Sequence, residues 1–183
     1  MGLHAHQARN GNRNTSETPL FLQQFAHECV EAGVDVVVIT GPHTLRGIEV
    51  HQRRPIFYSL GNFFFHEDAI RRIPESINQT VESTVPDVRG EVASPETDST
   101  VTHDTDNWIS VVPQCEFSAD GTLANVTLYP CTLQPRAPTP QRGTPALATG
   151  EKAHEILQTL AERSEAFGTT IHINGDTGTI DLP

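Results

Sequence analysis

The sequence predicts an α/β fold that consists of a βαβ unit, then β-hairpins and a C-terminal amphipathic helix. A run of mostly β-branched residues at 34–39 is typical of a strand that is covered on both faces in a parallel sheet. Apolar residues at helical spacing precede it, over residues 18–33. Later in the chain, turn sequences separate short apolar stretches, which favours antiparallel hairpins.

The βαβ unit occupies the N-terminal part of the chain. Residues 1–5 can form only a short strand. A helix is expected from Thr18, as its N-cap, to Gly33, where a glycine commonly ends a helix. The strand at 34–39 completes the crossover. The loop after it, residues 40–44, is therefore placed at the carboxyl end of a parallel strand, where open α/β sheets bind their ligands.

A hairpin is expected next, between strands at residues 48–51 and 56–60. The pair Gly61-Asn62 predicts a tight turn after the second strand. The three phenylalanines at 63–65 could continue that strand as the other side of a hairpin. A turn of this kind could also serve to shape a site nearby.

The rest of the chain is predicted to complete a single domain over residues 1–183, interrupted by one irregular segment. Residues 66–107 hold ten acids and three prolines and cannot bury enough apolar surface to order themselves, so a disordered or lid-like insertion is expected there. A hairpin follows over residues 109–129, then an amphipathic helix over 146–166 and a final hairpin over 170–182.

Composition excludes some classes of partner. The chain has 23 acidic against 12 basic residues and a formal net charge of −11. It offers no basic surface for sequence-independent binding of nucleic acid. No run approaches the roughly 18–20 apolar residues of a membrane span, and the N-terminal residues hold no apolar signal-peptide core. With no such segment in this sequence, the cytoplasm is the location expected by default.

Three of the nine histidines form the best candidate site. His4 and His6 are two residues apart in an extended segment, so their imidazoles lie on the same face. His43 follows the next parallel strand, and the three could meet around one divalent ion such as Zn²⁺ or Mn²⁺. Alternatively, one histidine of the pair ligates while the other donates a hydrogen bond. Asp35 and Glu49 are not expected to be ligands, and the other six histidines are interpreted as ordinary surface or edge residues.

These residues lie in a stretch with a recognisable pattern. Residues 32–65, AGVDVVVITGPHTLRGIEVHQRRPIFYSLGNFFF, closely resemble the signature of the CapA-type capsule synthesis proteins. Weaker similarity extends back to His4 and forward over most of the chain. The resemblance implies a branch of the calcineurin-like metallophosphoesterases, with a two-sheet αβ sandwich and a two-metal site on its loops. It also implies a part in poly-γ-glutamate capsule assembly, often at the cell envelope.

The resemblance also implies roles for individual residues. His4 and His43 match histidines of the family's metal site, and Asn62 lies at the turn that supports it. Thr40 stands where the family has a further histidine, and the family's first acidic strand and Asn-His motif are not found in this sequence. The expected function is that of an N-terminally truncated, metallophosphoesterase-related fragment whose metal site is incomplete and inactive by itself. Its substrate would be an anionic polymer or a phosphorylated small molecule. The alternative is a non-catalytic binding or scaffold module for cell-envelope polymer assembly.

Overall fold

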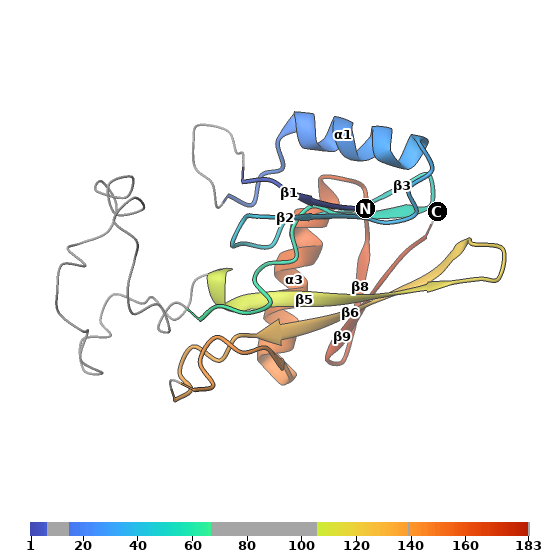
Figure 1. Cartoon of the computed structure of the whole chain (residues 1–183). Helices are drawn as coiled ribbons and strands as arrows, with labels where there is room; N and C mark the ends of the chain where they lie inside the picture. The colour runs from blue at the N-terminus through green and yellow to red at the C-terminus, as the bar shows by residue number, and fades with distance from the viewer. Residues whose placement is uncertain (7–14, 67–105, 139, 183) are drawn as a thin grey trace, which may run out of the picture.

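The computed structural model describes residues 1–6, 15–66, 106–138 and 140–182. The described parts form two β-sheets, with helix α1 on the outer face of the first sheet and helix α3 packed on the second sheet and against β3 of the first (Figure 1). The predicted α/β class is confirmed, as a partial sandwich of two sheets. The 66–107 insertion lies outside the described residues except for its two ends.

The first sheet contains the predicted βαβ unit. Its strand order is β1-β2-β4-β3, and only β3 runs antiparallel to its neighbour. The strands are β1 Gly2–His4, β2 Val37–Thr40, β3 Ile48–His51 and β4 Arg54–Phe57. In the parallel pair of β1 and β2, His4 is in register with Thr40. The carboxyl ends of both strands therefore meet at one edge of the sheet.

Helix α1, Leu20–Glu31, connects β1 to β2 and packs on the sheet through the buried residues Leu22, Ala26 and Val30. Its N-cap is Pro19 rather than the predicted Thr18. The reason is the backbone: Pro19 is still extended, at φ −60° and ψ 142°, and its carbonyl accepts the first helical hydrogen bonds. The proline therefore lies just outside the helix instead of in its first turn.

The hairpin of β3 and β4 is confirmed, with Gln52 and Arg53 at positive φ in its turn. The predicted continuation through Gly61 to residues 63–65 is wrong. Gly61 bridges to Ser110 of the second sheet, and the backbone N–H of Phe65 bonds to the Gly143 carbonyl. These residues therefore cross from one sheet to the other. A methyl group at Gly61 would lie 2.5 Å from the Ile109 carbonyl oxygen, so the crossing needs a glycine.

The second sheet is antiparallel, with strand order β5-β6-β9-β8 and a short strand β7 paired to β6. Its strands are β5 Ile109–Phe117, β6 Leu123–Thr132, β7 Ala146–Leu147, β8 Ile171–Asn174 and β9 Thr177–Ile180. Both predicted hairpins are present. Helix α3 covers Gly150–Glu165 and does not begin at Ala146 as predicted. Residues 146–147 pair with β6 instead, and Gly150 enters the helix at φ +59°.

Two apolar clusters hold these layers together. The smaller one joins α1 to the first sheet through Val37, Ile39 and Ile56, among others. The larger one joins the opposite face of that sheet to α3 and the second sheet. Val36 and Val38 pack on the larger cluster while Val37 and Ile39 are in the smaller one, as expected for a strand that is covered on both faces. In the described part of the chain, no helix is long and apolar enough to cross a bilayer.

Candidate functional site

The predicted histidine pair lies at the carboxyl end of β1. The Nε2 atoms of His4 and His6 are 3.0 Å apart, and the two rings meet nearly edge to face. The Nδ1 atom of His4 is 3.1 Å from the hydroxyl of Thr40, which itself donates toward the Leu3 carbonyl. Since that hydroxyl proton is already engaged, His4 Nδ1–H is the donor to Thr40. The lone pair of His4 is then on Nε2, directed at His6.

His43 lies on the other side of His6, with its ring centroid 5.8 Å from that of His6. Its Nδ1 atom is 2.7 Å from Asn62 Oδ1, while the amide nitrogen of Asn62 donates to the Asn107 carbonyl at 2.9 Å. Because the amide nitrogen is committed to Asn107, the oxygen of Asn62 must accept from His43 Nδ1–H. This places the lone pair of His43 on Nε2. Asn62 thus contacts His43 from a segment that crosses between the sheets rather than from a hairpin turn.

The loop that carries His43 is fixed from both sides. On one side, Gly41 lies so close to β1 that a β-carbon would be 2.7 Å from the Ala5 carbonyl oxygen, and its φ is +128°. On the other side, the Thr44 hydroxyl donates to Asp106, which also accepts from Arg163 of α3 at 2.7 Å. Burial raises the pKa of Asp106, but the hydrogen bonds from Thr44 and Arg163 outweigh it, so the net pKa is lowered. The histidine loop is therefore held to β1 and to α3.

The three side chains partly meet the requirements of a metal centre. Two nitrogens bound about 2.1 Å from one ion, at a right angle, are about 3.0 Å apart, which is the separation of His4 Nε2 and His6 Nε2. His43 is further away. Among the described residues, these three are not a set whose ligand atoms all lie within 4.8 Å of one another. As they stand, the two Nε2 atoms share a hydrogen bond, so the proton of His6 would have to leave before both nitrogens bind one ion, and His43 would have to move toward them to join.

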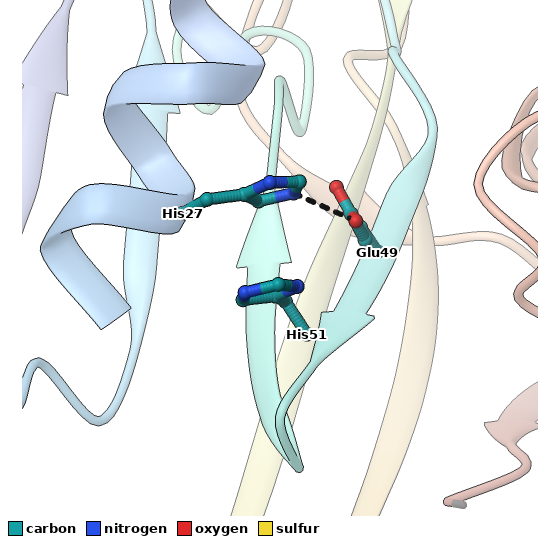
Figure 2. Close-up of side chains that lie close together, drawn as sticks. All are labelled: His27, Glu49 and His51. Carbon is teal, nitrogen blue, oxygen red and sulfur yellow. Dashed lines mark hydrogen bonds and ion pairs between the residues drawn. The ribbon is translucent and has the colours of Figure 1, made fainter. Parts of the chain in front are cut away.

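A second cluster was missed by the sequence interpretation. His27, Glu49 and His51 have ligand atoms that all lie within 4.8 Å of one another, and Figure 2 shows the three side chains converging between α1 and β3. The sequence alone predicts ordinary surface or edge histidines at positions 27 and 51 and no ligand role for Glu49. The only local signal is the spacing of Glu49 and His51, two residues apart on one strand. Their meeting with His27 depends on how α1 lies over the sheet.

A cavity of about 580 Å³ lies beside the 3-10 helix Asp106–Trp108, between α3 and the end of β6. None of the three site histidines lines it. Its cationic residues are Arg136 and Lys152, and Lys152 is paired with Glu155 at 2.9 Å. Asp106, which lines the cavity, accepts from Thr44 in the loop that carries His43.

Comparison with known proteins finds relatives of the part of the chain that contains these histidines. Residues 4–67 match the family model described as bacterial capsule synthesis protein PGA_cap. The PGA biosynthesis protein CapA of Bacillus subtilis is 47% identical over 45 residues, which is 25% of this chain and 12% of that protein. The capsule biosynthesis protein CapA of Bacillus anthracis is 42% identical over 45 residues, or 25% of this chain and 11% of that protein.

A longer match covers nearly the whole chain. The uncharacterized protein y4sH of Sinorhizobium fredii is 34% identical over 197 aligned positions, which span 98% of this chain. The chain spans 40% of the length of that relative. The matched family region contains His4, His6 and His43 together with Thr40 and Asn62. Through residues 4–67, this chain is related to the CapA-type capsule synthesis proteins, as its sequence predicts.

Proposed function

We propose that this chain carries part of the divalent-metal site of a metallophosphoesterase-related capsule synthesis protein, with His4, His6 and His43 as its ligands for Mn²⁺ or Zn²⁺. The observation that carries the proposal is the 3.0 Å separation of His4 Nε2 and His6 Nε2 at the carboxyl edge of a parallel sheet. The hydrogen bonds of Thr40 and Asn62 support it, because they direct an Nε2 lone pair from His4 and from His43. Such outer contacts typically orient metal-binding histidines.

A bound ion would supply positive charge for an anionic oxygen of a phosphoryl or carboxylate group. The residues of this chain orient the ion: Thr40 sets the ring of His4, Asn62 sets that of His43, and Gly41 allows β1 and the histidine loop to approach. Two-metal hydrolysis also needs carboxylates that hold both ions about 3.5–4 Å apart. We propose that these ligands come from the part of such proteins that this chain does not span.

The alternative function is a binding or scaffold module for a polymer of the cell envelope. An acidic protein with a net charge of −11 repels a polyanion unless a cation lies between them. A histidine-held ion would provide that contact without hydrolysis. The PGA named for the Bacillus subtilis relative is a polyanion of this kind, and poly-γ-glutamate is therefore the substrate or ligand to be tested.

The test uses the purified 183-residue chain and the double variant His4→Ala/His6→Ala. The two altered side chains are exposed or half-exposed, so the variant is expected to fold. Calorimetry should show one Mn²⁺ fewer per chain in this variant than in the original chain, because only the cluster at His27 and Glu49 remains. A control with His154→Ala/His172→Ala, which alters two exposed histidines elsewhere, should bind as many ions as the original chain. An unchanged number of bound ions in His4→Ala/His6→Ala would refute the site.

Two further readouts separate the functions. With Mn²⁺ or Zn²⁺ present, the chain should hydrolyse an aryl phosphodiester no faster than the double variant, because the site is incomplete. Chelator-sensitive hydrolysis that the variant loses would contradict incompleteness. Retention of poly-γ-glutamate on immobilised chain, abolished by EDTA and by His4→Ala/His6→Ala, would favour the binding module over the hydrolase fragment.

A further inference from the structure

We propose a second divalent-metal site, formed by His27, Glu49 and His51, on the face of the first sheet that α1 covers. His27 Nε2 lies 2.8 Å from Glu49 Oε1, and the ring of His51 stacks on that of His27 at 4.0 Å with an interplanar angle of 6° (Figure 2). Each residue offers one ligand atom, and all of these atoms lie within 4.8 Å of one another. In the described part of the chain, no other set of three histidine, cysteine or acidic side chains meets this criterion.

The fold explains why these residues converge. Glu49 and His51 are two apart in β3, so both side chains are on the same face of the sheet. Helix α1 lies over that face, anchored by Ala26 and Val30, and presents His27 beside Ala26. Strands β2 and β4 separate β3 from β1 in the sheet, so this cluster is distinct from the edge that holds His4 and His6.

One observation beyond proximity indicates a ligand. The Nε2 atom of His51 is buried from solvent and has no hydrogen-bond partner among the described residues. A buried nitrogen of this kind is costly unless something binds it. Glu49 is also oriented from its other oxygen, because Oε2 accepts a 2.5 Å hydrogen bond from the Tyr58 hydroxyl.

The ligand set fits zinc. Two imidazoles and one carboxylate are a set that Zn²⁺ uses with a fourth position left for water. Ligand atoms around a tetrahedral ion with bonds of about 2.1 Å are about 3.4 Å apart, so the side chains must rotate and the 2.8 Å contact between His27 and Glu49 must widen. The hydrogen bond from Tyr58 to Oε2 would keep Glu49 a monodentate ligand, with Oε1 directed at the histidines.

Binding would cross-link α1 to β3. The His27–Glu49 hydrogen bond already joins these elements, and its donor proton would leave Nε2 when an ion takes its place. The side chains are not deeply buried, since His27 is 33% and Glu49 14% exposed, so an ion can reach them from solvent. The expected consequence is a chain that unfolds at a higher temperature when Zn²⁺ is bound.

The test starts from the full chain with His4→Ala/His6→Ala, which removes the other candidate site. This protein is titrated with Zn²⁺ by calorimetry and with Co²⁺ by visible absorption, which reports tetrahedral ligands. One ion per chain is expected, with a rise in the unfolding temperature. Adding His27→Gln or His51→Gln should weaken binding at least tenfold, whereas adding His154→Gln on the exposed face of α3 should leave it unchanged.

A second variant covers the case in which a histidine substitution disturbs folding. Tyr58→Phe keeps the buried ring but removes the hydroxyl that orients Glu49, and it should weaken Co²⁺ binding with an unchanged circular dichroism spectrum. The proposal is overturned if the His4→Ala/His6→Ala chain binds no Co²⁺ or Zn²⁺. It is also overturned if the Co²⁺ and Zn²⁺ affinities are unchanged by His27→Gln, by His51→Gln and by Tyr58→Phe. In that case the cluster is only a hydrogen bond between His27 and Glu49, with no metal site. Because His4 and His6 are already absent, neither result bears on the proposed function.

Discussion

Replacing Asn62 by leucine tests how the crossing segment prepares His43 for metal binding. Leucine has a similar size but can neither accept from His43 Nδ1, now 2.7 Å away, nor donate to the Asn107 carbonyl, now 2.9 Å away. His43 then loses the contact that keeps its proton on Nδ1. The carbonyl of Asn107, which lies in the 3-10 helix just before β5, also loses its hydrogen-bond donor. The variant should therefore affect both stability and affinity.

The magnitude follows from the two bonds. Each typical hydrogen bond contributes about 0.5–1.5 kcal/mol net, so the unfolding free energy should fall by roughly 1–3 kcal/mol. In a domain of this size, 1 kcal/mol lowers the midpoint of thermal unfolding by about 2–4 °C. Loss of an outer partner of a metal-binding histidine typically lowers affinity about 10–100-fold. The Zn²⁺ affinity of the histidine site should fall by a factor in that range.

The assay combines calorimetric Zn²⁺ titration with thermal unfolding followed by circular dichroism, both in the His27→Gln/His51→Gln chain, so that the second cluster does not contribute. Asn125→Leu is the matched control, because Asn125 bonds to Thr127 within β6 and lies in the other sheet. It should change the unfolding temperature slightly and the Zn²⁺ affinity not at all. A folded Asn62→Leu chain that binds Zn²⁺ as tightly as the original would refute the argument that Asn62 prepares His43.

Three further variants probe the scaffold around the site. Hydrogen bonds from Thr44 and Arg163 lower the net pKa of Asp106. The ionised carboxylate therefore stabilises the fold above the ordinary carboxyl pKa of about 4, and this stabilisation is lost as the pH falls below that value. Asp106→Asn should flatten that part of the acid unfolding curve. Ser164→Ala removes a buried hydroxyl that accepts from the first backbone N–H of β3 at 3.0 Å, and chemical denaturation should show a loss of about 1–3 kcal/mol. Gly47→Ala would place a β-carbon 2.3 Å from the Arg163 carbonyl oxygen, so the protein should unfold at a clearly lower temperature or not accumulate folded.

Each of these has a control within the chain. Asp120→Asn alters an exposed carboxyl that is bonded only within its own turn, and it should leave the acid midpoint nearly unchanged. Thr159→Ala removes a similar helix hydroxyl that bonds only to Glu155. Gly2→Ala adds a methyl group where nothing lies within 4 Å. If a control variant is as destabilising as the variant it is matched to, the contacts that Asp106, Ser164 or Gly47 makes are not the cause of the lost stability.

The sequence predicted the βαβ unit because the determinants are local. The β-branched run at 34–39 and the apolar face of the preceding helix each specify one element, and the right-handed crossover leaves little choice in how they assemble. The proximity of His6 to both His4 and His43 follows from that arrangement. It needs no information beyond strand register and loop position.

Other features depended on contacts that the sequence does not display. Gly61-Asn62 is a common hairpin pair, yet Gly61 lies against Ser110, almost fifty residues further along the chain. Leu147 fits the apolar pattern of α3, but residues 146–147 pair with β6 and leave it 66% exposed. The cluster around Glu49 was missed for the same reason, since tertiary packing and not local pattern brings His27 to it.

The most direct test of the histidine site is a Zn²⁺ titration followed by the ring signals of the histidines in NMR. The His27→Gln/His51→Gln variant serves as the protein, so that the second cluster does not contribute. The account predicts that the ring signals of His4, His6 and His43 change together and saturate at one ion per chain. If the signals of His43 alone change, or those of His4 and His6 do not respond, the shared metal site is contradicted.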